Sequence, residues 1–152
     1  MSKCWWQKCR PLNQPTDKKY GHDLDHIAVA VHDLAAATVR FIELLDAKII
    51  HEEIVESQGV QVRLIQVEDA MYELLQPLSG DSAIARYLDK KGEGLHHIAF
   101  RVGDIYAEHK RLSELGLQLL QDKPVSGARN KLIFFIHPRD MGGILTEICQ
   151  PR

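Results

Sequence analysis

Two histidines and two glutamates occupy matching positions of an internal repeat, and together they form a candidate metal-binding set. His26 lies in LDHIAVAVHDL (24–34) and His97 lies in LHHIAFRVGDI (95–105), and ten of the twenty-one positions from 24 to 44 are identical to those from 95 to 115. Glu73 in MYELLQP likewise matches Glu147 in LTEICQP. Imidazole nitrogens and carboxylate oxygens are ligands for divalent ions. Because duplicated modules can bring equivalent residues together, the sequence predicts one metal site shared by both halves.

The elements that would position these residues follow the same order in each half: a strand, a helix and three further strands. Asp33 and Asp104 are suitable N-caps for the two helices, and Gly116 is a suitable end for the second. Alternating apolar residues predict strands in the first half at 26–31, 48–55, 59–67 and 70–76. The strands expected in the second half are 97–102, 117–122, 131–137 and 143–149.

These patterns predict an α+β fold in which two tandem βαβββ modules form a cupped, pseudo-twofold, mostly antiparallel sheet. With 152 residues, the chain is long enough for one compact domain with a sizeable core. We expect this single domain over 23–150, with module one at 24–76, a connector at 77–94 and module two at 95–150. A short helix from Asp81 to Lys90 is expected within the connector.

Bulk composition excludes several classes of function. A formal net charge of −2, with 45% hydrophobic and 26% charged residues, gives no reason to expect nucleic acid or membrane partners. No apolar run approaches the ~20 residues that span a bilayer. Residues 1–22 are basic and contain two prolines, so we expect a flexible N-terminal extension. The expected location is cytoplasmic, with the mitochondrial matrix as the alternative if the basic N-terminus is a targeting leader.

Strand parity directs both histidines away from the helices. His26 shares a strand face with Ala28 and Ala30, and His97 shares one with Ala99, while the opposite, bulkier faces suit packing beneath the helices. We therefore expect both imidazoles to point into the concave side of the sheet, where the small alanines leave room for a ligand. A bare carboxylate is costly to bury in an apolar strand, and a cation would offset that cost for the two glutamates.

The chain resembles the vicinal oxygen chelate superfamily, which has glyoxalase-like folds, and within it the methylmalonyl-CoA epimerase family. The resemblance is carried by LDHIAVAVHDL, SQGVQVRL, YELLQPLSGDSAIARYLDKKGEGLHHIAFRV and IFFIHPRDMGGILTEICQ. It covers roughly residues 24–150. The LSGDSAIARYL and GEGLHHIAF runs are more specific than the His/Glu spacing, which the whole superfamily shares.

The resemblance implies an epimerase that interconverts (R)- and (S)-methylmalonyl-CoA by removing the C2 proton through a metal-stabilised thioester enolate. It implies that His26, Glu73, His97 and Glu147 hold one divalent ion, with Co²⁺ first and Mn²⁺, Ni²⁺, Zn²⁺ or Mg²⁺ as alternatives. Glu147 is the first candidate for a catalytic acid/base group and Glu73 is a candidate for the second. The expected partners are an acyl-CoA thioester substrate and a second copy of the chain in a homodimer.

Two departures from the family pattern affect these expectations. Some bacterial relatives carry a second acidic residue where this chain has Val62, so the second proton carrier stays open between Glu73 and a water held by Gln58 or Gln61. The turn that relatives write as GAHGK reads GARNK here, at 127–131. Its Arg129 and Lys131, with Arg139, are candidates to meet the CoA phosphates at the rim of the site.

Three other functions stay open at this point. A glyoxalase I-type isomerase acting on a glutathione hemithioacetal would use a similar metal set, and an extradiol dioxygenase would use two histidines and one carboxylate with Fe(II). A non-catalytic small-molecule-binding protein of the same fold would need no such set. The remaining histidines are expected at the surface or behind the metal ligands, with His137 near the mouth of the cup; the others are His22, His32, His51, His96 and His109.

Overall fold

The computed structural model describes residues 21–152; residues 1–20, most of the expected extension, lie outside the described part. In chain order the described strands and helices are β1 (Asp23–Ala30), α1 (Leu34–Leu45), β2 (Lys48–Val55), η2 (Glu56–Gln58), β3 (Val60–Val67), β4 (Ala70–Pro77), α2 (Ala83–Lys91), β5 (Gly94–Arg101), α3 (Ile105–Glu114), β6 (Val125–Ser126), β7 (Lys131–Ile136), η3 (Pro138–Asp140) and β8 (Thr146–Pro151).

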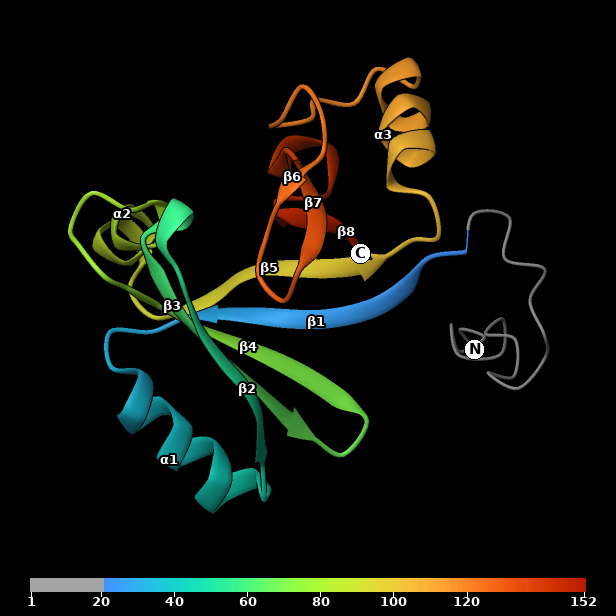
Figure 1. Cartoon of the computed structure of the whole chain (residues 1–152). Coiled ribbons are helices and arrows are strands. Elements are labelled where there is room, and N and C mark those ends of the chain that lie inside the picture. The colour runs from blue at the N-terminus through green and yellow to red at the C-terminus, as the bar shows by residue number, and fades with distance from the viewer. Residues whose placement is uncertain (1–20) are drawn as a thin grey trace, which may run out of the picture.

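The described strands form one eight-stranded sheet in the order β2-β3-β4-β1-β5-β8-β7-β6. The first strands of the two modules, β1 and β5, lie antiparallel at its centre, and the other strands of each module continue to either side (Figure 1). Pairing is parallel between β1 and β4 and between β5 and β8, and antiparallel in the other five pairs. This pseudo-twofold, mostly antiparallel α+β arrangement confirms the fold predicted from the repeat.

The helices begin where their capping residues predict. The Asp33 carboxylate accepts a hydrogen bond from the backbone N–H of Ala36, and Asp104 accepts one from Ala107 in the same way. Each satisfies a backbone donor that has no partner within its own helix. The connector helix α2 starts two residues later than predicted, because its N-cap is Ser82 rather than a residue before Asp81.

The two sides of the sheet are packed differently. Beneath α1, Val31, Leu34 and Leu74 belong to a buried apolar cluster, and an equivalent cluster lies beneath α3. On the cup side, α2 covers Ala28 and Ala30 with Ile84 and Leu88 among its contacts. The histidine-bearing face of β1 is therefore partly covered by α2 and only partly open.

One predicted strand is absent from module two. Residues 117–122 make a single β-bridge, between Leu119 and Ile136, instead of a ladder. Beside this bridge the Gln121 side-chain oxygen accepts the Phe135 N–H, so a side chain replaces the backbone acceptor. The paired edge element is the two-residue β6, which follows Pro124 and so lies beyond a residue that lacks an N–H.

The last strand also starts later than predicted. Gly142 and Gly143 have φ values of 65° and 91°, in the left-handed region that glycine tolerates best. They form a turn after η3, and β8 begins only at Thr146. No helix within residues 21–152 is long and apolar enough to span a membrane.

Candidate metal centre

The sheet register brings the four predicted residues onto two rungs at the centre of the cup, separated by the Ile27–Ile98 pair. Each rung has a fully buried alanine in the middle, flanked by one histidine and one glutamate: Ala28 pairs with His97 and Glu73, and Ala99 pairs with His26 and Glu147. Paired residues on neighbouring strands point to the same side of a sheet. The short alanine side chain therefore leaves space between the two polar groups of its rung.

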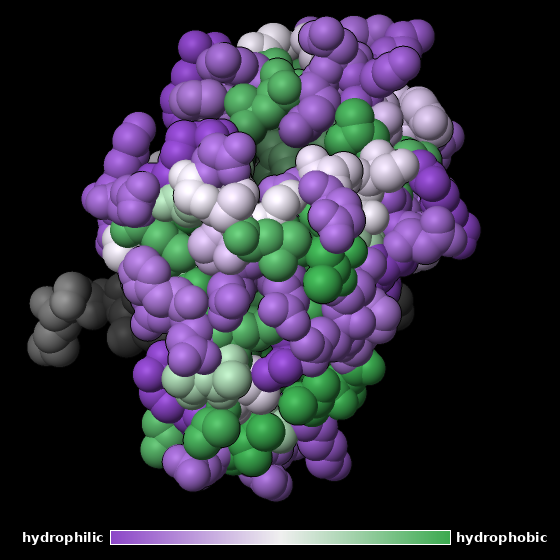
Figure 2. Space-filling model, turned by 60° about the vertical axis from the view of Figure 1, so that its left-hand side comes forward, coloured by the Kyte–Doolittle hydropathy of each residue, from purple (hydrophilic) through white to green (hydrophobic). Residues whose placement is uncertain are grey.

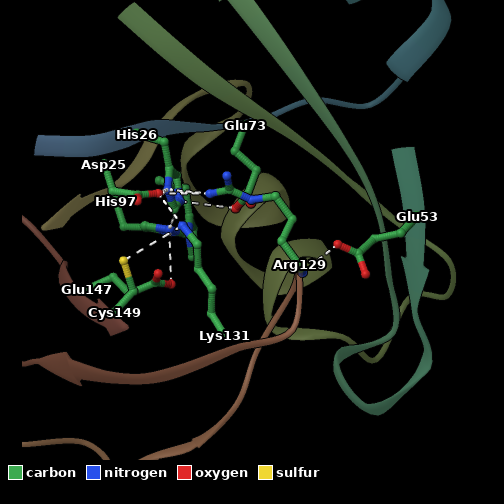
Figure 3. A network of polar contacts seen from close by, with 10 residues as sticks. Asp25, His26, Glu53, Glu73, His97, Arg129, Lys131, Glu147 and Cys149 are labelled. Atoms are coloured by element: carbon green, nitrogen blue, oxygen red, sulfur yellow. Dashed lines mark hydrogen bonds and ion pairs between the residues drawn. The ribbon is translucent and has the colours of Figure 1, made fainter. Parts of the chain in front are cut away.

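The imidazoles meet at the centre of this arrangement. His26 Nε2 lies 3.3 Å from His97 Nε2 and 3.3 Å from the Glu73 carboxylate, and His97 Nε2 lies 3.5 Å from the Glu147 carboxylate. Ligand atoms of His26, His97 and Glu147 all lie within 4.8 Å of one another, which suits a shared cation, and Glu73 joins this group through His26. Figure 3 shows these side chains converging from both halves of the sheet.

Burial and mutual contact shift the pKa values of all four groups. Burial lowers the pKa of His97 to about 3 and raises that of Glu147 to about 8. Burial alone would also lower the pKa of His26, but hydrogen bonds to Asp25 and Glu73 raise it to about 9. Burial would raise the pKa of Glu73, but its hydrogen bond with His26 holds the value near 2. Among the protein's own groups, neutral pH thus favours a proton on His26 and another on Glu147.

Asp25 is a buried carboxylate that the sequence analysis did not identify. His26 Nδ1 donates to Asp25 Oδ1 at 2.8 Å, Arg129 Nη2 donates to the same oxygen at 2.8 Å, and the Lys131 ammonium also contacts it. The repeat pointed to this position, because Asp25 and His96 are equivalent polar residues and each directly precedes a candidate metal-binding histidine.

The structure places Lys131 away from the rim, because it is only 6% exposed and is ion-paired with Asp25. Arg129 lines the cavity and pairs with the same carboxylate. The Arg129 backbone N–H donates to Glu53 of β2 at 2.6 Å, which links the turn after β6 to module one. Arg129 Nε is the one buried side-chain nitrogen or oxygen in residues 21–152 without a hydrogen-bond partner. Arg139 is exposed and paired with Asp140.

A cavity of about 660 Å³ opens over the four residues. Gln58 lines it, whereas Gln61 lies on the opposite face of β3 and donates to Glu52, so Gln61 is excluded as a holder of water in the cup. Val62 faces the cavity and is 1% exposed, which makes that wall apolar. Among the other histidines only His96 reaches the cavity; His137 instead caps the turn at η3.

The sequence matches the family model of the glyoxalase/bleomycin resistance protein/dioxygenase superfamily over residues 25–135. The chain belongs to this superfamily.

Within it, the similar proteins confirm the predicted resemblance to methylmalonyl-CoA epimerases. The ethylmalonyl-CoA/methylmalonyl-CoA epimerase of Cereibacter sphaeroides is 39% identical over 129 residues, covering 84% of this chain and 96% of that protein. The crystal structure of the Mycobacterium tuberculosis methylmalonyl-CoA epimerase superposes with a TM-score of 0.81 at 39% identity, covering 85% and 87% of the two chains. A variant of the Streptomyces coelicolor enzyme, solved with 2-nitronate-propionyl-CoA, gives a TM-score of 0.81 at 35% identity and 85% and 94% coverage.

Proposed function

We propose that this chain is a divalent-metal-dependent epimerase that interconverts (R)- and (S)-methylmalonyl-CoA by removing and returning the C2 proton. The observation that carries the proposal is the convergence of His26, His97 and Glu147 donor atoms within 4.8 Å, beneath a cavity of about 660 Å³. A cavity of this size is in the range that encloses a small acyl group. The similarity to enzymes named as methylmalonyl-CoA epimerases supports an acyl-CoA thioester as the substrate.

The proposed ligands of the ion are His26, Glu73, His97 and Glu147, with Co²⁺ as the first candidate and Mn²⁺, Ni²⁺, Zn²⁺ or Mg²⁺ as alternatives. The donor set fits such an ion, because two imidazoles and two buried carboxylates offer mixed nitrogen and oxygen ligation. When bound, a divalent ion would supply Lewis-acid stabilisation of the negative charge that builds on the thioester oxygen, worth several kcal/mol.

The proposed proton carriers are the two glutamates, one for each face of the substrate. Glu73 lies on β4 and Glu147 lies on β8, and these strands flank the central pair β1 and β5 on opposite sides. An acyl group held over the centre of the sheet would therefore have one carboxyl group to each side. Epimerisation needs an acid/base group on each face of C2, and the pseudo-twofold arrangement meets that need without a carboxylate at Val62.

Proton NMR of methylmalonyl-CoA in D₂O tests the proposal directly. Purified protein with Co²⁺ should remove the C2 signal and collapse the coupling of the methyl group. EDTA should abolish this exchange. His97→Ala should lose metal and activity together, whereas His32→Ala, on an exposed residue, should keep both.

The same assay identifies the competing functions. No exchange with added Co²⁺ or Mn²⁺ would overturn the epimerase proposal. Turnover of a glutathione hemithioacetal in its place would indicate a glyoxalase-type enzyme. Ligand binding that EDTA leaves unchanged, without turnover, would indicate a non-catalytic binding protein. Native activity in His97→Ala would exclude His97 as a ligand.

We also propose that the chain forms a homodimer and that residues 23–150 make up a single domain. The proposed location is the cytoplasm, with the mitochondrial matrix as the alternative compartment. Support for the dimer comes from large apolar side chains that are 49–77% exposed near the end of α1 and the start of β2, namely Leu44, Leu45, Ile49 and Ile50. Figure 2 shows green apolar surface in its lower part, at the height of α1 in Figure 1. Analytical ultracentrifugation checks the assembly, and a monomer at micromolar concentration would contradict it.

A further inference from the structure

The central strand pair is interrupted twice, and each interruption falls at the residue that precedes a candidate metal histidine. On β1, Leu24 pairs with Phe100 and His26 pairs with Ala99, so Asp25 is an extra residue in the ladder. On β5, Ala28 pairs with His97 and Val29 pairs with Leu95, so His96 is the extra residue. These are β-bulges, which re-aim side chains and are frequent beside active sites.

The bulges change what neighbouring residues can do. In a regular strand, consecutive side chains point to opposite faces, so Asp25 and His26 could not contact each other over the cup. Here Asp25 Oδ1 lies 2.8 Å from His26 Nδ1, and His96 Nδ1 lies 2.8 Å from His97 Nδ1. Each metal histidine therefore has its Nδ1 occupied by the residue before it in the chain.

This contact leaves one ring nitrogen of each histidine facing the centre. With Nδ1 engaged, the Nε2 atoms of His26 and His97 point at each other across 3.3 Å. For Nε2 to bind a cation, Nδ1 must carry the proton and donate it to an acceptor. Asp25 offers a carboxylate oxygen for this purpose, and His96 offers the free Nδ1 lone pair of a neutral imidazole.

We propose that Asp25 and His96 are positioning residues that fix the tautomer and orientation of the two metal-binding histidines. The proposal rests on the metal site of the proposed function and adds the residues that prepare it. Asp25 is itself held by Arg129 and Lys131, and the His96 ring packs edge-on against Tyr87 at a centroid distance of 5.0 Å. Both acceptors are thus fixed in place before a cation arrives.

The two supports are unequal in charge. A carboxylate acceptor increases the basicity of its imidazole more than a neutral acceptor does, so Asp25 should strengthen His26 as a ligand more than His96 strengthens His97. Loss of an outer partner of this kind weakens metal binding by about 10–100-fold. We place Asp25→Ala toward the upper part of this range and His96→Phe toward the lower part.

Metal affinity, measured by competition of Co²⁺ with a chromophoric chelator, tests the proposal on the full chain. Asp25→Ala and His96→Phe remove the acceptors, while Asp25→Asn and His96→Gln keep an oxygen that can accept from Nδ1. The conservative variants should recover most of the lost affinity. Asp89→Asn and His32→Gln, at exposed positions, are the matched controls and should bind within about twofold of the wild type.

A spectroscopic measurement separates positioning from a general loss of stability. The visible absorption of bound Co²⁺ reports ligand geometry, and it should shift in Asp25→Ala and His96→Phe but not in the controls. If either of these variants fails to fold by circular dichroism, Asp25→Asn and His96→Gln serve in its place, because a lost charge or a weaker acceptor should still shift the spectrum.

The outcomes distinguish this inference from the proposed function. Wild-type affinity and an unchanged Co²⁺ spectrum in folded Asp25 and His96 variants would overturn the positioning roles, even if the wild type exchanges the C2 proton. A wild-type protein that binds no divalent ion would overturn the metal site and the positioning roles together. Wild-type binding without C2 exchange, with weakened variants, would overturn only the epimerase assignment.

Discussion

His26 and His97 lie with their Nε2 atoms 3.3 Å apart, although 71 residues separate them in the chain. Two imidazole lone pairs at this distance repel each other unless a proton or a cation lies between them. The pKa of His26 is raised to about 9 by its contacts with Asp25 and Glu73, against the lowering effect of burial, so His26 carries that proton at neutral pH in the absence of metal. A divalent ion must displace it.

Metal uptake should therefore release protons. Neutral pH also favours a proton on Glu147, whose pKa burial raises to about 8. Because ligands must be deprotonated to bind a metal, we expect about two protons released per ion at pH 7 and less than about one at pH 9.5. The apparent affinity should rise as the pH increases from about 6.5 toward 9 and then level off.

Calorimetry of Co²⁺ binding in two buffers with different ionisation enthalpies measures the released protons. The buffer dependence should be strong at pH 7 and weak at pH 9.5. As a control, Glu147→Gln should release about one proton fewer at pH 7, because its amide does not ionise in this pH range. Binding enthalpies that do not depend on the buffer at pH 7 would contradict this account.

The alanine at the centre of each rung should be essential to metal binding. Ala99 is fully buried between His26 and Glu147 on neighbouring strands. A larger side chain would occupy the space where their ligand atoms converge, so Ala99→Val should abolish measurable Co²⁺ binding. Overpacking should also reduce the free energy of unfolding by about 1–3 kcal/mol.

The matched control for Ala99→Val is Ala107→Val on the exposed side of α3, which should leave metal affinity unchanged. Chelator competition and denaturant unfolding give both quantities. Native affinity in a folded Ala99→Val protein would mean that the cation position lies away from these rungs.

Much of the fold was predictable because local chemistry and long-range packing agree. Asp33 and Asp104 cap the helices as predicted, and β2 occupies the residues predicted from alternation alone. The repeat identified His26 and His97 because duplication preserves chemistry at equivalent positions. These features depend on residue type and spacing, which the sequence displays directly.

The remaining features depend on backbone geometry that residue types do not specify. The bulges at Asp25 and His96 reverse the simple alternation of side chains, so parity could not reveal either contact. Arg129 and Asn130 have φ values of 55° and 51°, and this left-handed backbone helps turn Arg129 inward from a loop that reads as a solvated rim. The missing strand at 117–122 reflects one side chain, Gln121, which accepts a backbone hydrogen bond.

The turn that carries Arg129 should depend on Gly127. A Cβ built at this position would lie 2.8 Å from two carbon atoms of Ile133, closer than nonbonded carbons approach. Gly127→Ala should therefore reduce the free energy of unfolding by about 1–3 kcal/mol through overpacking. Gly103→Ala is the control, because its Cβ would meet nothing within 4 Å, and it should change stability by about 0.5 kcal/mol or less. Equal stabilities of the two variants in urea unfolding would argue against a tight turn.

Removing one partner of the buried ion pair between Lys131 and Asp25 should strongly reduce the free energy of unfolding. Lys131→Met leaves the buried Asp25 carboxylate without its ammonium partner, although Arg129, His26 and the more distant Arg101 stay beside it, so we expect a loss of about 3 kcal/mol. Lys110→Met removes an exposed ion pair with Glu114 and should cost about 0.5 kcal/mol or less.

A double-mutant cycle with Asp25→Asn isolates the pair, because the second substitution removes the charge that Lys131→Met leaves uncompensated. The double variant should be more stable than the sum of the single losses predicts.

Acid unfolding gives an independent check. Burial would raise the pKa of Asp25, but hydrogen bonds from His26 and Lys131 hold it below its usual value of 3.8. A lowered pKa stabilises the folded state above about pH 4, and that contribution disappears as the pH falls. Lys131→Met should therefore lose less stability than the wild type between about pH 5 and about pH 2. Identical acid profiles would show that Lys131 does not stabilise the Asp25 carboxylate.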